Sequence, residues 1–204
     1  MFHATDCILI MGRRKCGKSF LSQNLQKLWP RKVIIDSLNE YTGEMVVHDF
    51  EGFAAELARL KAENKDSFTL IFQFDPENAV SDLEFEHVMR LCYYFGNIQV
   101  VIEEVQIYCS VHSMPHWLQQ ALLTGRHQNL SLMFTTQRPG ELHKTILSQC
   151  AHIFCGQIIE GNDLRYLSSF LRKNTDELIK IPEREFLYFH NGQTIIIKND
   201  AVSL

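Results

Sequence analysis

The sequence lacks several features that mark whole classes of protein. It has no hydrophobic run near the ~18–20 residues needed to cross a bilayer, so no membrane insertion is expected. Its amino terminus is interrupted by His3 and Asp6 and has no basic lead, so a secretory signal is not expected. Positive charge is not in excess, because 20 Lys and Arg stand against 24 Asp and Glu. This balance argues against a strongly basic nucleic-acid binder, although a ring with a basic pore is compatible with it.

The sequence also lacks the markers of disulfide-rich, repetitive and multidomain proteins. The six cysteines form no Cys-x-x-Cys pair and no disulfide framework, and several lie inside apolar runs, as reduced buried cysteines do. No internal repeat, low-complexity tract or Pro/Gly-rich linker divides the 204 residues. Hydrophobic residues make up 46% and charged residues 22%, as in ordinary globular chains. We therefore expect a single domain over residues 1–204.

Short apolar runs alternate with helical stripes along the chain. Strands are expected at residues 7–11, 32–36, 68–74, 99–103, 130–136 and 152–156, with amphipathic helices between most of them. One such stripe, formed by Leu21, Leu25 and Leu28, ends before Pro30. Asn191-Gly192 between two apolar runs predicts an antiparallel hairpin over about residues 185–198. The pattern favours an α/β fold with a mostly parallel sheet and helices on both of its faces.

A phosphate-binding motif follows the first expected strand. Gly12-Arg13-Arg14-Lys15-Cys16-Gly17-Lys18-Ser19 fits the P-loop (Walker A) pattern G-x-x-x-x-G-K-[ST] at every position. Glycines let backbone N–H groups point at phosphate oxygens beside the positive end of the next helix. Lys18 is expected to neutralise the β- and γ-phosphates, and the Ser19 hydroxyl to bind Mg²⁺. The sequence therefore predicts a nucleoside triphosphate site in which residues 12–19 and the next residue, Phe20, contact the nucleotide.

The residues at the variable positions of this motif can each be interpreted in two ways. Arg13, Arg14 and Lys15 either add positive charge around the phosphates or form a solvated rim. Cys16 either has a pKa lowered by Lys15 and the helix amino end, which would make it sensitive to alkylation, or simply fills its position. Both questions are open from the sequence.

Two acids follow the buried run of residues 99–102. Because both faces of that strand are expected to be buried, Glu103 and Glu104 are expected at its carboxyl end. Ligands of open α/β sheets bind at that end of the strands. Glu103 is expected to be the Walker B acid, reaching Mg²⁺ through water. Glu104 is the candidate general base for the attacking water.

Other classes of P-loop protein fit less well. Guanine-specific switches need an Asn-Lys-x-Asp box, which the sequence lacks, and Asp49-Phe50-Glu51-Gly52 is expected to start a helix. The alternative function is a small-molecule or nucleoside kinase. Such enzymes need no paired acids after an apolar strand, and typically carry an Arg-rich lid that the sequence does not show. GTP stays open as a nucleotide.

A polar amide and an arginine flank the strand expected at residues 130–136. Gln137 at its tip is expected beside the γ-phosphate, where it can sense nucleotide or position water. Arg126, just upstream, is better placed to reach the site of a neighbouring subunit, as an arginine finger worth about 10³–10⁵ in rate. The alternative for Arg126 is an ion pair with a surface acid.

Together, residues 12–19, Glu103 and Glu104, Arg126, and Gln137 within Thr136-Gln137-Arg138-Pro139 resemble the HerA–FtsK superfamily of ring-forming, DNA-pumping ATPases. Residues 36–41 also resemble that superfamily, and the likeness extends from residue 7 to about residue 156. Because the chain begins at the first core strand, it most resembles the genome-packaging ATPases of double-stranded DNA viruses with internal membranes, including turreted icosahedral archaeal viruses. Glu103 stands where Asp is usual in that family.

The resemblance implies a function and a set of partners. It implies Mg²⁺-dependent ATP hydrolysis that drives double-stranded DNA into a viral capsid, with ATP and Mg²⁺ as cofactors. The motor is expected to be a homo-oligomeric ring, a hexamer or a pentamer, with capsid or vertex proteins as further partners. Its expected place is the cytoplasm of the infected host cell, in association with the virion vertex. Residues 107–116 and 138–145 are candidates for the pore.

Overall fold

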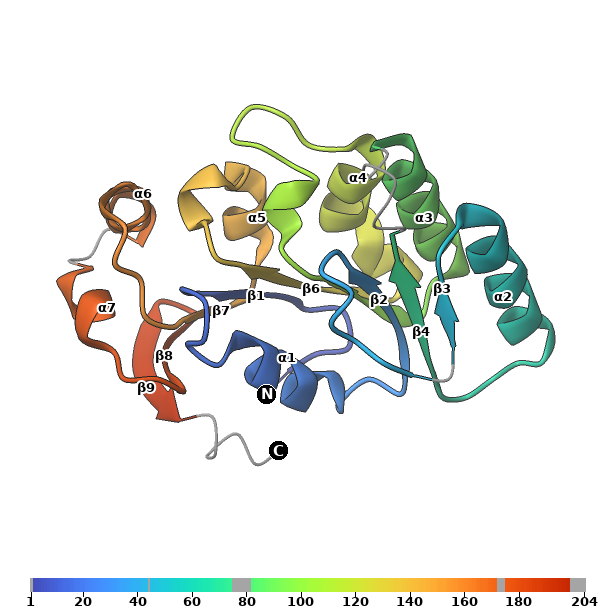
Figure 1. Cartoon of the computed structure of the whole chain (residues 1–204), viewed down its shortest axis with the longest axis horizontal. Coiled ribbons are helices and arrows are strands. Elements are labelled where there is room, and N and C mark those ends of the chain that lie inside the picture. Colours follow the sequence, from blue (N-terminus) through green and yellow to red (C-terminus); the bar gives the residue numbers. More distant parts are fainter. Residues whose placement is uncertain (1, 44, 75–81, 172–174, 199–204) are drawn as a thin grey trace. The chain divides into compact units, whose positions relative to one another are not determined.

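The computed structural model describes residues 2–43, 45–74, 82–171 and 175–198. These residues form the expected α/β fold, with nine strands hydrogen-bonded in the order β3-β4-β2-β5-β6-β1-β7-β8-β9 (Figure 1). The contacts group into two compact units, each assembled from separate stretches of chain. Unit 1 comprises residues 1–6, 26–103 and 114–133, and unit 2 comprises residues 7–25, 104–113 and 134–204. The single domain over residues 1–204 stays a prediction.

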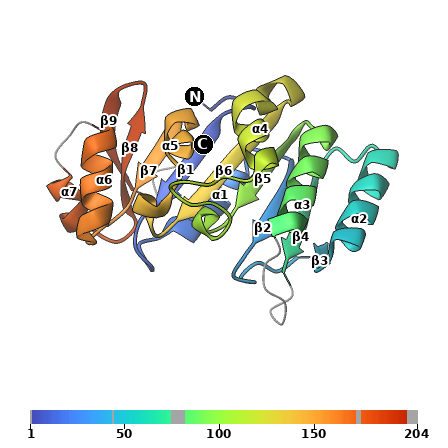
Figure 2. The same ribbon diagram turned by 90° about the horizontal axis from the view of Figure 1, so that it is seen from above.

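Unit 1 is built on parallel strands. Its elements are β2 (Arg31–Asp36), β3 (Val46–Val47), α2 (Phe50–Ala62), β4 (Phe68–Gln73), α3 (Asp82–Phe95), β5 (Ile98–Ile102), α4 (His116–Thr124) and the 3₁₀ helix η2 (Gly125–Gln128). β2 pairs in parallel with both β4 and β5, and β3 pairs in parallel with β4. Seen from above, α2, α3 and α4 lie side by side (Figure 2).

The elements of unit 1 follow from local sequence. α2 begins where Asp49 caps it, because the Asp49 Oδ1 accepts a hydrogen bond from the Gly52 N–H at 2.6 Å. This confirms the helix start expected at Asp49–Gly52. The stripe Phe53, Leu57 and Leu60 is buried. All residues of β5 are buried, as the two covered faces of a parallel strand require.

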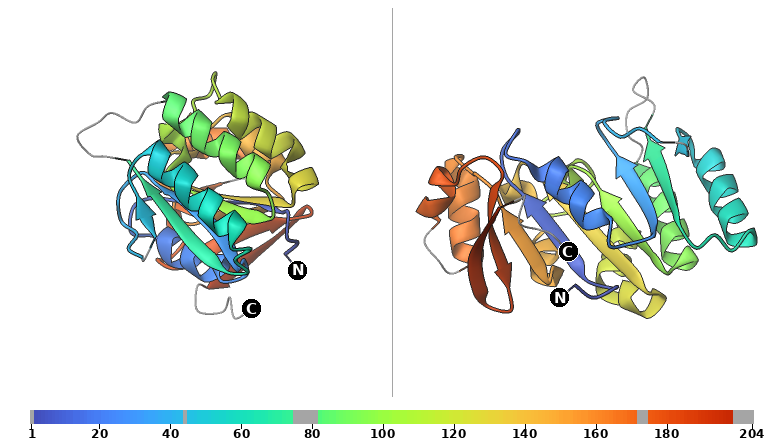
Figure 3. Two further views of the ribbon diagram at one scale, coloured as in Figure 1. Left: turned by 90° about the vertical axis from the view of Figure 1, so that its right-hand side faces the viewer. Right: turned by 90° about the horizontal axis from the view of Figure 1, so that it is seen from below.

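Unit 2 carries the strand before the P-loop and the carboxyl-terminal hairpin. Its elements are β1 (Cys7–Met11), most of α1 (Lys18–Gln26), the 3₁₀ helices η1 (Val105–Ile107) and η3 (Pro139–Glu141), α5 (Lys144–Gln149), β7 (His152–Cys155), α6 (Gly161–Leu171), α7 (Asp176–Lys180), β8 (Glu185–His190) and β9 (Gln193–Lys198). β1 and β7 are parallel, whereas β7, β8 and β9 are antiparallel. α1 and α5 cover opposite faces of β1, and the right-hand view of Figure 3 has α1 in front. β6 (Leu130–Thr136) begins in unit 1 and ends in unit 2.

Most expected elements are confirmed, and the differences have physical reasons. β1 and β6 have the expected bounds, and the hairpin turns at Asn191-Gly192, both with positive φ, as a two-residue turn requires. α1 ends at Gln26, so Leu28 lies beyond the helix and is 38% exposed instead of completing its stripe. β3, α5, α6 and α7 were not expected; most are too short to show a period. Among the described helices, none is both long and apolar enough to cross a membrane.

Candidate functional site

The P-loop joins β1 to α1 within unit 2. Gly12 and Gly17 have φ of +149° and +104°, and Lys15 lies between them at +66°. Side chains rarely adopt these angles, so both glycines meet a backbone requirement. A Cβ at Gly12 would also lie 2.7 Å from the Cys16 Sγ and 3.2 Å from the Gly156 Cα. The loop is therefore folded tightly around the Cys16 side chain.

Cys16 is a packing residue of this loop. Its side chain is buried, and the burial raises the pKa of the Cys16 thiol more than the nearby Lys18 ammonium lowers it. The interpretation of a lowered pKa is therefore wrong. It failed because the loop motif does not reveal that the thiol points inward. A Cβ on Gly156 would lie 2.9 Å from the Cys16 Sγ, so the thiol fills the space that two glycines leave.

Lys18 is buried at the amino end of α1 and is held by the loop itself. Its Nζ donates to the Gly12 carbonyl at 2.9 Å and to the Arg13 carbonyl at 3.3 Å. The Glu104 Oε1 lies 3.9 Å from the same ammonium. A phosphate on the loop would offer this ammonium stronger acceptors than two carbonyls. The position fits the expected contact with the β- and γ-phosphates.

Glu104 is the acid that unit 2 brings to the P-loop. It is buried, and its backbone is left-handed, with φ 49° and ψ 56°. Such a conformation costs a non-glycine residue about 1–3 kcal/mol and must be held by its surroundings. The Thr135 Oγ1 accepts a hydrogen bond from the Glu104 N–H at 3.0 Å. The strained turn aims the carboxylate at Lys18.

Gln137 meets the same carboxylate. Its backbone N–H donates to the Glu104 Oε2 at 3.0 Å, and its Nε2 donates to the Oε1 at 2.8 Å. The sequence-predicted residues Lys18, Glu104 and Gln137 therefore lie together, as expected from strands whose carboxyl ends share one edge. We call these three residues the carboxylate cluster.

Sequence reasoning missed Gln106. This residue lies on η1, two positions after Glu104, and its Nε2 donates to the Glu104 Oε2 at 2.6 Å. Its backbone belongs to a short 3₁₀ helix with no recognisable motif, so the only signal was its nearness to the acid in sequence.

Glu103 belongs to unit 1, where a tyrosine holds it. The Tyr41 hydroxyl donates to the Glu103 Oε1 at 2.6 Å, and the Ser37 hydroxyl donates to the Glu103 carbonyl at 2.8 Å. The buried Asp36 carboxylate accepts the Tyr41 N–H at 2.8 Å and the Gln73 Nε2 at 2.8 Å. Residues 36–41, noted in the sequence only as a resemblance, thus form the support of Glu103.

The expected magnesium ligands are Ser19 and Glu103. Both offer oxygen atoms, which Mg²⁺ prefers, and the Ser19 side chain at the start of α1 is exposed. Ser19 lies in unit 2 and Glu103 in unit 1, so their joint binding of a metal stays a prediction. Phe20 is 46% exposed, and its contact with nucleotide also stays a prediction.

Arg126 lies on η2 in unit 1. It is exposed, and it forms no ion pair within the described residues, so the finger role and the surface-acid alternative both stay predictions. Arg138, by contrast, is held by its own chain. Its Nε lies 3.3 Å from the Glu141 Oε1 and 3.9 Å from the Oδ2 of the buried Asp163. The Oδ1 of Asp163 accepts a hydrogen bond from the Gly140 N–H at 2.8 Å.

Arg13 and Arg14 of the loop border a pocket in unit 2. The pocket has a volume of about 290 Å³ and is lined by Arg13, Arg14, Gln137, Arg138, Ile158, Ile159, Glu160 and Asp163. Arg13 lies 3.9 Å from Glu183, whereas Lys15 is exposed on the loop. Three arginines and two acids thus line this pocket, and the choice between a phosphate-binding role and a solvated rim for Arg13, Arg14 and Lys15 stays open.

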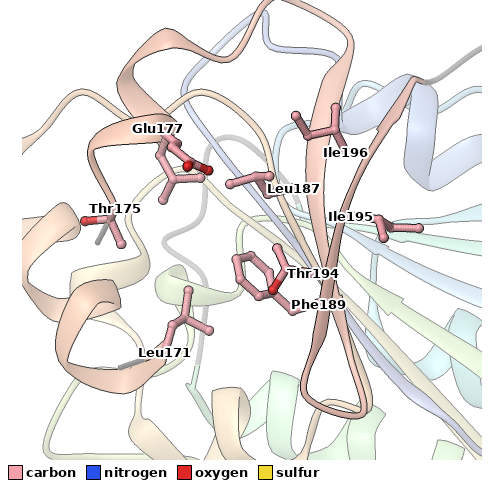
Figure 4. Close-up of a pocket in the computed structure, with 9 residues that line it drawn as sticks. Leu171, Thr175, Glu177, Leu187, Phe189, Thr194, Ile195 and Ile196 are labelled. Atoms are coloured by element: carbon pink, nitrogen blue, oxygen red, sulfur yellow. The ribbon is translucent and has the colours of Figure 1, made fainter. Parts of the chain in front are cut away.

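A second pocket of about 460 Å³ opens elsewhere in unit 2. Leu187 and Phe189 of β8 form one wall, and Leu171 and Thr175 form the other (Figure 4). No P-loop residue lines it, and its walls are mostly apolar. It is therefore separate from the carboxylate cluster.

Comparisons with known proteins agree with this architecture. No family model matches the sequence. Protein P9 of Pseudoalteromonas phage PM2 is 32% identical over 94 residues, a match that spans 44% of this chain and 43% of that protein. The genome packaging NTPase B204 from Sulfolobus turreted icosahedral virus 2, in complex with ATP-gammaS, superposes with a TM-score of 0.78 at 19% identity, covering 97% of this chain and 98% of that one.

A second similar structure is that of a VirB4 protein. VirB4 of Thermoanaerobacter pseudethanolicus superposes with a TM-score of 0.67 at 13% identity, covering 96% of this chain and 90% of that one. At these identities the two structural matches show a shared fold. The chain thus has the fold that its resemblance to the HerA–FtsK superfamily predicts, and the mostly parallel sheet and the antiparallel hairpin are confirmed.

Proposed function

We propose that the chain is a Mg²⁺-dependent ATPase that drives double-stranded DNA into a viral capsid. The observation that carries the proposal is the carboxylate cluster, in which a buried acid lies 3.9 Å from the buried P-loop lysine and accepts a hydrogen bond from a strand-tip amide. Paired with a P-loop, these groups have the chemistry that hydrolysis of a γ-phosphate needs. The B204 fold, found in complex with ATP-gammaS, supports ATP as the nucleotide.

Each residue of the site has a step to perform. The loop N–H groups bind the phosphates, and Lys18 leaves the Gly12 and Arg13 carbonyls to contact the β- and γ-oxygens. Glu104 takes a proton from the attacking water. The water oxygen bonds to the γ-phosphorus, and the bond from the γ-phosphorus to the oxygen that bridges it to the β-phosphate breaks. The products are ADP and inorganic phosphate, and the proton passes to them. Mg²⁺, held by Ser19 and by Glu103 through water, would neutralise charge on the phosphates.

Gln137 connects this chemistry to the presence of nucleotide. Its amide Nε2 donates to the Glu104 Oε1. A γ-phosphate offers the same N–H group a competing acceptor, so nucleotide binding loosens the hold of Gln137 on the base. Gln137 is therefore the sensor in this proposal.

Arg126 supplies the argument for a ring. An exposed arginine with no ion pair within the described part of its own chain is available to a neighbouring copy. We assign it the role of the arginine finger in trans, worth about 10³–10⁵ in rate. The ring is a hexamer or a pentamer of this chain, and it acts in the cytoplasm of the infected cell, in association with capsid or vertex proteins at the virion vertex.

DNA is the proposed substrate of movement. Because the chain has a net charge of −4, its binding to DNA depends on local basic groups in the pore. Residues 107–116 and 138–145 remain the candidates for the pore. Contacts to phosphates predict sequence-independent binding that weakens steeply with salt. The phage protein P9 and the packaging NTPase B204 support a viral setting.

The test is ATP turnover with and without duplex DNA, with the particle mass measured in each condition. A ring motor gives a multimer whose phosphate release rises when DNA is added. Turnover that requires a small-molecule acceptor, in a monomer or dimer, would instead establish the kinase alternative.

The trans role of Arg126 has its own test. Arg126→Ala chains, which keep an intact P-loop, are mixed with Lys18→Ala chains, which keep an intact finger. Mixed rings should recover turnover that neither variant has alone, because some sites then combine both wild-type groups. Mixtures that behave as the sum of the two variants contradict the assignment.

A further inference from the structure

The Gln106 carboxamide is oriented by the acid beside it. Because a carboxylate only accepts hydrogen bonds, the Gln106 Nε2 must face the Glu104 Oε2, from which it lies 2.6 Å away. A flipped amide would set two oxygens against each other. The direction of the Gln106 Oε1 is therefore fixed as well.

That Oε1 is buried and has no hydrogen-bond partner within the part of the chain that the structure describes. A buried acceptor without a hydrogen bond is unfavourable, so such an atom calls for a donor that arrives with the ligand. The Oε1 is separated from the Nε2 by only two covalent bonds, so a donor that it binds is also close to Glu104. Lys18 and both donors of Gln137 already face the carboxylate itself.

We propose that Gln106 is a positioning residue for the attacking water, an inference that rests on the proposed ATPase function. Its Nε2 holds Glu104, and its Oε1 accepts the hydrogen of the water that Glu104 does not remove. A water with both hydrogens engaged directs an oxygen lone pair at the γ-phosphorus. One proton then passes to Glu104, the new P–O bond forms, and the bond to the ADP oxygen breaks.

Two substitutions separate the halves of this role. Gln106→Met removes both the donor and the acceptor at nearly the same size. Gln106→Lys keeps a donor to Glu104 and removes the acceptor. Each should lower kcat about 10²-fold, the effect of a misplaced reactant, with KM for ATP within about twofold of the wild type. Gln119→Met, at an exposed position of α4, is the matched control and should keep wild-type turnover.

A second measurement distinguishes positioning from general support. Wild type and variants are titrated with ADP plus aluminium fluoride, which mimics the transferring phosphoryl group with its water, and with ADP alone. Both Gln106 variants should lose affinity for the fluoride complex by at least tenfold and keep their affinity for ADP. Thermal unfolding of each variant verifies that it is folded.

The outcomes are separable from those of the proposed function. A wild-type chain without ATP turnover refutes the ATPase proposal itself. An active wild type with a Gln106→Lys variant of equal kcat overturns the inference, because the lost acceptor then has no role. Equal losses of ADP and fluoride-complex affinity also overturn it, since they indicate a structural role.

Discussion

Replacing Glu104 by glutamine gives the sharpest test of the carboxylate cluster. The carboxylate accepts the Gln137 N–H and the Gln106 Nε2 at one oxygen and the Gln137 Nε2 at the other. If the oxygen of the new amide takes the place of the Oε2, which accepts two hydrogen bonds, its NH₂ group takes the place of the Oε1 and faces the Gln137 side chain. A flip of the Gln137 amide then presents an oxygen to that NH₂ group. The variant should therefore keep these hydrogen bonds and fold, and its loss of stability comes from the buried Lys18 ammonium, which no longer faces a charged acid.

Turnover should respond far more than stability. An amide cannot take a proton from water, and general-base catalysis contributes about 10²–10⁴ in rate. With 1.36 kcal/mol for each tenfold change, Glu104→Gln should raise the activation free energy by about 2.7–5.4 kcal/mol. ATP affinity should be equal to or tighter than that of the wild type, because the charge 3.9 Å from the Lys18 Nζ no longer competes with phosphate.

The assay combines steady-state phosphate release with a direct titration of nucleotide binding. Glu103→Gln is the matched control, since it makes the same chemical change at the neighbouring position. That control should raise the Mg²⁺ concentration needed for half-maximal turnover. A Glu104→Gln chain that binds ATP and retains more than a tenth of wild-type turnover would refute the role of Glu104 as base.

Three further predictions follow from the packing of unit 2. Gly12→Ala should abolish ATP binding in a titration while Gly161→Ala, a substitution into open space, does not, because only the former Cβ meets the Cys16 Sγ and a strained φ. Burial raises the pKa of the Cys16 thiol, so its alkylation at pH 8 in the native protein should be slower than that of free cysteine, as mass spectrometry of labelled peptides can measure. Burial also raises the pKa of Asp163 above its ordinary value of 3.8, so the stability contributed by its protonated form is present below about pH 4 and is lost as pH rises through the folded pKa. Asp163→Asn should therefore flatten the dependence of the unfolding free energy on pH above pH 4, and an unchanged slope would contradict that cause.

The parts that the sequence predicts are those governed by local pattern. β1, the P-loop and α1 follow from an apolar run, two glycines and an amphipathic stripe within twenty residues of each other. The meeting of Gln137 with Glu104 follows from a general rule, because both residues stand at carboxyl ends of strands of one sheet. Neither inference required knowledge of side-chain packing.

The parts that it does not predict depend on contacts between distant segments. The Cys16 thiol is buried because Gly156, 140 positions later, leaves room for it, and no feature of the loop motif reports that. The left-handed conformation of Glu104 is supported by Thr135 on another strand. Tyr41 reaches Glu103 across 62 positions of sequence. Each of these is a tertiary contact, which single-sequence patterns do not encode.

The distribution of arginines gives the physical reason to look for the finger in a second copy. Charge that develops on the γ-phosphate needs a cation besides Lys18, and arginine is suited to it. Arg138 is engaged by Glu141 and Asp163, and Arg13 lies near Glu183, so moving either towards phosphate would separate an existing pair. Within the described chain, Arg126 has no such pair to lose, and the same holds for Arg14 on the loop itself. An arginine without an ion-pair partner in its own chain can bind a neighbour's phosphate without first separating an ion pair, so hydrolysis that depends on Arg126 would also depend on assembly of the ring.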